Sequence, residues 1–168
     1  VFVYTIWLKR KTPQNIVIGG ASGALPPVIG WAIATNSISL ESIAFFLIIF
    51  FWTPSHFWAL SLYKADDYKK AGIPMLPVTN GIQNTKKNIL IYSLLMIPTI
   101  IFPYYIGFVG EVYLSLSLLL TFYYNLICYQ LYNYKVGKFN IKKARHIFSY
   151  SIIYLFLIFV FFLVDKII

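Results

Sequence analysis

The chain alternates long apolar runs with short polar connections. A transmembrane helix needs ~20 predominantly apolar residues, and five runs meet that requirement. They are predicted as helices at about residues 13–35, 42–63, 89–108, 113–134 and 146–164. A shorter apolar run at residues 1–8 is interpreted as the end of a further, partial helix whose beginning lies outside the sequence. The pattern predicts an all-α, polytopic transmembrane helical bundle.

Composition supports an integral membrane protein. Hydrophobic residues make up 60% of the chain and charged residues only 11%, whereas about a quarter of the residues of a soluble domain are charged. The net charge of +9 would suggest nucleic acid in a soluble protein, but the Lys and Arg residues lie in the connections between apolar runs. We therefore expect no nucleic-acid partner. Cys128 is the single cysteine, which excludes an internal disulfide and disfavours a thiolate metal site.

Positive charges alternate between the connections. Residues 9–12, 64–88 and 135–145 are rich in Lys and Arg, while residues 36–41 and 107–112 contain none. Basic connections of membrane proteins stay on the cytoplasmic side. The sequence therefore predicts that the three basic connections face the cytoplasm and that Ile168 lies on the opposite side.

The first complete run carries signals for a helix start and for close packing. Thr12 offers a capping hydroxyl, and Pro13 suits the first helical position. Gly19 and Gly23 are four residues apart, beside Gly20, and small residues at this spacing let another helix approach closely. This face is predicted to pack against a neighbouring helix.

Residues 52–78 combine aromatic, imidazole and carboxylate side chains. If residues 52–67 form one helix, the ~100° step per residue places Tyr63 and Asp67 within about 20° of His56, and Trp52 within about 40°. Such a stripe suits a site for an amphiphile with a buried tail or ring and a charged end. The alternative interpretation is an interfacial aromatic belt followed by a charged loop.

Asp66 and Asp67 are two of only five acidic residues, and they lie among Lys64, Lys69 and Lys70. Carboxylates hold Mg²⁺, which bridges phosphate oxygens, and ammonium groups offset charge on a departing diphosphate. The pair therefore favours a magnesium-diphosphate site, although an Asp-Asp-Tyr loop is also common on ordinary solvated surface.

Three segments carry a family resemblance. They are residues 4–32 (YTIWLKRKTPQNIVIGGASGALPPVIGWA), 50–78 (FFWTPSHFWALSLYKADDYKKAGIPMLPV) and 144–159 (ARHIFSYSIIYLFLIF). Together they resemble the protohaem IX farnesyltransferases, the haem O synthases of the UbiA-like intramembrane prenyltransferases. The resemblance implies a bundle of about nine helices, of which residues 1–168 form the C-terminal portion of a single transmembrane domain, with one partial and five complete helices.

The resemblance also implies a reaction. Farnesyl diphosphate would transfer its farnesyl group to a vinyl group of haem b, giving haem O for haem-copper oxidases, with Mg²⁺ as the cofactor and haem b as a substrate. It implies residence in the bacterial cytoplasmic (inner) membrane or the mitochondrial inner membrane, with the acidic loop on the cytoplasmic or matrix side. Haem A synthase or the terminal oxidase assembly would be further partners.

Candidate site residues follow from the same resemblance, with Lys64, Trp52 and Tyr63 added from the charge cluster and the helical stripe described above. It assigns metal binding and catalysis to Asp67 and Asp66. The set for binding diphosphate comprises Lys9, Arg10, Thr12, Asn15, Lys64 and Arg145. The set for the haem or prenyl cavity comprises His56, Trp52, Trp58 and Tyr63. For His56, a helix-packing role is the alternative.

The sequence departs from the family pattern in one respect. The family's first acidic motif, Asn-x-x-x-Asp-x-x-x-Asp, has no match among the 168 residues. Half of the implied metal site is therefore missing from this chain, and the chain alone is expected to be inactive. The remaining alternatives are a non-catalytic membrane factor that binds haem or prenyl lipid, a catalytically incomplete fragment and, less favoured, a transporter subunit.

Overall fold

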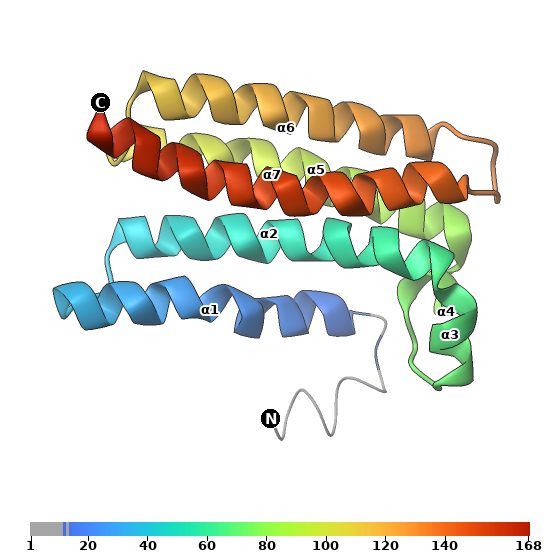
Figure 1. The fold of residues 1–168 in the computed structure, drawn as a ribbon. Helices are drawn as coiled ribbons and strands as arrows, with labels where there is room; N and C mark the ends of the chain where they lie inside the picture. Colours follow the sequence, from blue (N-terminus) through green and yellow to red (C-terminus); the bar gives the residue numbers. More distant parts are fainter. Residues whose placement is uncertain (1–11, 13) are drawn as a thin grey trace.

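The computed structural model describes residue 12 and residues 14–168, and five long helices lie side by side within them (Figure 1). The helices in chain order are α1 (Asn15–Thr35), α2 (Leu40–Tyr63), α3 (Ala65–Lys70), α4 (Leu76–Thr79), α5 (Gly81–Tyr105), α6 (Glu111–Tyr132) and α7 (Ile141–Ile167). No strand occurs in this described part of the chain. The predicted all-α class is confirmed.

The five long helices are each long and apolar enough to cross a membrane. They contain 21 to 27 residues, and a helix of ~20 residues spans the hydrocarbon core of a bilayer. The chain is an integral membrane protein.

Helix α2 is the centre of the bundle. It packs against α1, α5 and α7, and α5 and α7 each pack against α6, so that α2, α5, α6 and α7 form a ring. Among the described long helices, α1 contacts α2 alone. A Cβ atom on Gly20 would lie 3.1 Å from Cγ2 of Thr53, so α1 approaches α2 closely at Gly20, whereas a Cβ atom on Gly23 of the predicted pair would meet nothing within 4 Å.

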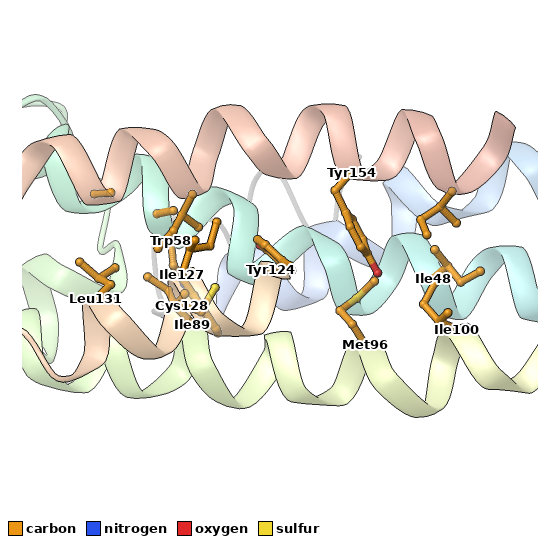
Figure 2. Packing of buried hydrophobic residues seen from close by; sticks show 14 of the residues in the cluster. Ile48, Trp58, Ile89, Met96, Ile100, Tyr124, Ile127, Cys128, Leu131 and Tyr154 are labelled. Carbon is orange, nitrogen blue, oxygen red and sulfur yellow. The ribbon is translucent and has the colours of Figure 1, made fainter. Parts of the chain in front are cut away.

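The core fills the inside of the four-helix ring (Figure 2). Trp58 and Ile48 of α2 meet Met96 of α5, Tyr124 of α6 and Tyr154 of α7, and all five side chains are fully buried. A hydroxyl inside the membrane is stabilised by a partner, and two of the core tyrosines find one on another helix. Tyr124 Oη lies 2.8 Å from Ser55 Oγ of α2, and Tyr154 Oη lies 2.9 Å from Thr121 Oγ1 of α6. These bonds join α6 to α2 and to α7.

One end of the bundle collects most of the polar connections. The start of α1, the helices α3 and α4, and the connection from α6 to α7 all lie at this end (Figure 1). We call it the basic end, because the predicted basic connections within residues 64–88 and 135–145 meet there. The connections that lack Lys and Arg lie at the other end. The side of the membrane that the basic end faces stays a prediction.

Two helices begin earlier than hydropathy indicated. Helix α5 begins at Gly81 rather than at residue 89, and α7 begins at Ile141 rather than at residue 146. Asn140 caps α7, since its side-chain oxygen accepts hydrogen bonds from the backbone N–H of Lys142 and Lys143. Hydropathy marks only the part of a helix that lies in lipid, whereas these helices continue beyond it with polar residues.

Candidate active site

A cavity of about 490 Å³ lies at the basic end, between α1, α2 and the segment that follows α2. Its walls are mostly apolar. The lining residues are Asn15, Ile16, Gly19, Gly20, Gly23, Ile49, Trp52, Thr53, Phe57, Tyr68, Ile73 and Met75. This composition suits a hydrocarbon chain rather than a polar solute.

The cavity has depth along both helices. Asn15 and Gly23 are eight residues apart on α1, as are Phe57 and Ile49 on α2, and eight residues of helix extend ~12 Å. Asn15 and Phe57 lie toward the basic end, close to Tyr68, while Gly23 and Ile49 lie deeper in the bundle. An occupant could therefore keep its head at the loops and its tail between α1 and α2.

The roof of the cavity comes from a sharp turn after α2. The backbone of Lys64 leaves helical geometry (φ −114°, ψ 18°), and α3 begins at Ala65. Gly72 then adopts a left-handed conformation (φ 65°), which favours glycine, and Ile73 N–H returns to Tyr68 C=O at 3.0 Å. The chain folds back, and Ile73 reaches the cavity.

The interruption at Lys64 overturns one prediction. Residues 52–67 do not form a continuous helix, because α2 ends at Tyr63 and the short α3 follows as a separate element. The spacing rule that placed Asp67 on the His56 stripe therefore does not apply.

Asp66 and Asp67 lie in the first turn of α3 and are both exposed. Carboxylates are favoured there by the partial positive charge of a helix N-terminus. Lys64 Nζ lies 3.0 Å from Asp67 Oδ2, with 53% and 64% of the two side chains exposed. An exposed pair of this kind contributes little to stability, so Asp67 can exchange Lys64 for another cation.

The described residues contain no group of three or more His, Cys, Asp or Glu side chains that could hold a metal ion. Two adjacent carboxylates nevertheless fit a share of a Mg²⁺ site, since Mg²⁺ is often held by one or two carboxylates together with substrate phosphates and water.

Trp52 lies at the cavity, whereas His56 lies at the interface between α2 and α7. Trp52 lines the cavity, and its indole N–H donates to Ser151 C=O at 2.8 Å. His56 is 6% exposed and stacks between Trp52 and Phe148, with ring centroids 4.3 and 4.5 Å away. Its Nδ1 lies 2.6 Å from Ser151 Oγ. His56 therefore packs α2 against α7, as the helix-packing alternative expected, and it does not line this cavity.

Trp58 also lies outside this cavity. Its side chain is fully buried in the core and meets Tyr92 of α5 edge-on, with centroids 5.2 Å apart. Tyr63, by contrast, remains at the basic end, where the Arg145 guanidinium carbon lies 5.5 Å from its ring centroid. Neither Trp58 nor Tyr63 lines the cavity, but the Tyr63–Arg145 contact brings two of the predicted site residues together from α2 and α7.

The predicted first-loop residues are described only in part. Thr12 Oγ1 accepts a hydrogen bond from Gln14 N–H at 3.2 Å, so its hydroxyl orders the turn before α1. Asn15 is buried and lines the cavity. Lys9 and Arg10 lie outside the described residues.

Tyr68 lines the cavity, although no sequence pattern predicted it. It follows Asp67 directly and lies at the basic end of the cavity. Burial raises the pKa of the Tyr68 phenol, as does the nearby Tyr63, while Lys64 lowers it. Tyr68 therefore stays protonated at neutral pH and can donate a hydrogen bond. The Gly72 and Pro74 turn signals were visible in the sequence, but not the direction in which they return the chain.

The comparisons with known proteins agree with this architecture. Residues 1–153 match the sequence profile of the UbiA prenyltransferase family. The chain belongs to the UbiA prenyltransferase family. The apolar cavity and the neighbouring Asp66–Asp67 pair thus belong to a chain of a prenyltransferase family.

This UbiA family chain is also similar in sequence to curated proteins. It is 76% identical over 167 residues to the protoheme IX farnesyltransferase of Pelagibacter ubique (strain HTCC1062), covering 99% of this chain and 55% of that protein. It is 50% identical over 164 residues to the protoheme IX farnesyltransferase of Parvibaculum lavamentivorans, covering 98% of this chain and 52% of that protein. The chain spans about half the length of the curated relatives it matches. No solved structure gives a significant match.

Proposed function

We propose that this chain is part of a protohaem IX farnesyltransferase, a haem O synthase. The observation that carries the proposal is the apolar cavity of about 490 Å³ whose basic end is closed by Tyr68, directly after the Asp66–Asp67 pair. Family membership and the names of the relatives support the same activity.

The proposed reaction joins farnesyl diphosphate, haem b and water. The bond between C1 of the farnesyl group and the diphosphate oxygen breaks, and diphosphate leaves with the electron pair. C1 forms a bond to a vinyl carbon of the haem, water adds to the other vinyl carbon, and a proton is released. The products are haem O and diphosphate.

The chain's own residues would divide this work by depth. Trp52, Phe57 and Ile49 would hold the farnesyl chain in the cavity and exclude water from it. Asn15 and Tyr68 lie at its basic end, where Tyr68 can donate a hydrogen bond to a diphosphate oxygen. This order keeps the charged end of the substrate near the loops.

Asp66 and Asp67 would hold Mg²⁺, and bound Mg²⁺ neutralises charge on the diphosphate as it leaves. Lys64 and Arg145, together with Lys9 and Arg10, would supply further positive charge. Lys64 pairs with Asp67 in this structure, and its exposed ammonium would also attract the anionic substrate.

The proposed setting is the bacterial cytoplasmic membrane or the mitochondrial inner membrane, with the basic end in the cytoplasm or matrix. The distribution of Lys and Arg supports this orientation. Haem O would pass to haem A synthase or to the assembly of a terminal oxidase.

A second candidate is a catalytically incomplete chain that binds haem or prenyl lipid. It is favoured by the two-carboxylate site, because the described residues offer no third acidic ligand. Under the first candidate, the chain becomes active once another segment supplies the missing acidic motif. Under the second candidate, it stays inactive.

A chimera tests both candidates. In this chimera, residues 1–168 replace the matching part of the Pelagibacter ubique relative. The purified chimera and the 168-residue chain are each incubated with haem b, farnesyl diphosphate and Mg²⁺, and haem O is followed by mass spectrometry. We expect haem O from the chimera and none from the chain alone. A chimera that inserts and binds both substrates without forming haem O would support the second candidate.

A further inference from the structure

A second hollow, of about 200 Å³, lies between α6 and α7 at the basic end. It shares no lining residue with the cavity described above. The residues that line it are Ile127, Gln130, Lys142, Lys143 and His146. The hollow is thus polar on the α7 side and opens between two adjacent helices of the bundle.

Contacts between the helices hold its polar side chains in place. Lys143 Nζ donates to Gln130 Oε1 at 3.3 Å. His146 Nε2 lies 3.1 Å from the hydroxyl of Tyr123 on α6. Two of the polar groups around the hollow are therefore positioned by α6 before any ligand arrives.

The hollow carries positive charge without a protein carboxylate to neutralise it. Its two ammonium groups, on Lys142 and Lys143, lie at the N-terminal end of the 27-residue helix α7, which adds partial positive charge. Within the described residues, the single ion pair is Lys64–Asp67. The acidic residues of the chain are elsewhere, at Glu41, Asp66, Asp67, Glu111 and Asp165.

An apolar seam continues from the hollow toward the middle of the bundle. Leu116, Tyr123 and Gln130 are seven residues apart on α6, and this spacing keeps side chains within about 20° per step. His146 and Ile153 repeat the same spacing on α7. Leu116 and Tyr123 are each 39% exposed and Ile153 is 55% exposed, so no described residue covers this surface.

We propose that the hollow is a binding site for an anionic phospholipid of the membrane leaflet at the basic end. The phosphate group binds Lys142 and Lys143, and an acyl chain lies along the seam past Tyr123 and Ile153. Basic pockets between transmembrane helices attract anionic lipid head groups in this way. The site does not depend on prenyl transfer.

Native mass spectrometry of the delipidated chimera tests the site, with phosphatidylglycerol as the probe and phosphatidylcholine for comparison. We expect preferential retention of phosphatidylglycerol. Lys142→Gln with Lys143→Gln should weaken that retention roughly fivefold for each lysine removed. Lys142→Arg with Lys143→Arg, which keeps both charges, should preserve most of it.

Lys135→Gln with Lys138→Gln is the matched control, because it removes the same charge from exposed positions at the same end. An equal loss of retention in both pairs of variants would show diffuse attraction and overturn the site. Displacement of the lipid by glycerol 3-phosphate at a similar concentration would also overturn it, since a soluble phosphate would then suffice without the seam. A chimera without prenyltransferase activity remains a valid sample.

Discussion

The carboxylate of Asp165, near the end of α7, accepts a hydrogen bond from the backbone N–H of Gly110 at 2.6 Å, just before α6 begins. Its second oxygen accepts from Tyr113 N–H at 3.0 Å. The first N–H groups of a helix have no partner inside the helix, so Asp165 caps α6 from a different element. The contact ties the C-terminal end of α7 to the start of α6.

Asp165→Asn should destabilise the protein by about 1 kcal/mol, because the amide keeps one acceptor oxygen where the carboxylate has two. Thermal unfolding of the detergent-solubilised chimera measures the change. Glu111→Gln is the control, since it removes a charge from the first turn of α6. A larger effect of Glu111→Gln would show that charge, rather than the two hydrogen bonds, stabilises this end.

Lys86→Met should loosen the connection between α6 and α7. Lys86 is fully buried, and its ammonium donates to the backbone carbonyls of Tyr134, Lys135 and Lys138. Removing the donor breaks these part-buried hydrogen bonds, and a hydrogen bond to a charged group contributes about 1.5–3 kcal/mol.

Limited proteolysis of residues 133–140 measures the effect of Lys86→Met, and faster cleavage is expected. Lys87→Met is the matched control, because the neighbouring Lys87 is exposed. Equal cleavage rates in the two variants would contradict a clamping role for Lys86.

Asp67→Asn in the chimera should lower the rate of haem O formation by ~10² to 10³, because it removes a formal charge from the proposed Mg²⁺ site. Stability should be almost unchanged, since the Lys64–Asp67 pair is exposed. Haem O formation is measured over a Mg²⁺ titration, and the variant should need more Mg²⁺. Asp66→Asn should also slow the reaction, because both carboxylates lie in the first turn of α3. Full activity of both variants would remove the metal-ligand assignment.

Gly23→Leu should shorten the prenyl chain that the cavity accepts. A Cβ atom at Gly23 would meet nothing within 4 Å, and Gly23 lines the deep part of the cavity, so a leucine side chain would enter space proposed for the farnesyl tail. The preference for farnesyl over geranyl diphosphate should fall roughly tenfold.

Competition between the two diphosphates, with both haem products quantified by mass spectrometry, measures the effect of Gly23→Leu. Gly30→Leu is the control, because a Cβ at Gly30 also meets nothing within 4 Å and Gly30 does not line the cavity. An unchanged preference in Gly23→Leu would place the prenyl tail elsewhere.

Sequence patterns predicted the surroundings of some residues of α1 and α2 better than those of others. Gly19 and Gly23 were predicted to let a helix approach closely, but the close contact is at the neighbouring Gly20, against Thr53, and a Cβ atom at Gly23 would meet nothing within 4 Å. His56 and Trp58 were predicted to face a cavity, but one packs on Ser151 and the other on Tyr92. A helix bearing aromatic residues all around gives no sequence signal for which face meets a ligand.

The sequence by itself determined the membrane-spanning helices, because the length of an apolar run and the alternation of basic connections are local properties of the chain. Tertiary structure decided where α2 ends, which way the chain turns at Gly72 and which residues line the cavity. It also gave Lys86 its carbonyl partners, 48 to 52 residues away. These contacts depend on how α2, α5, α6 and α7 pack around one core, and hydropathy does not encode the rotation of one helix against another.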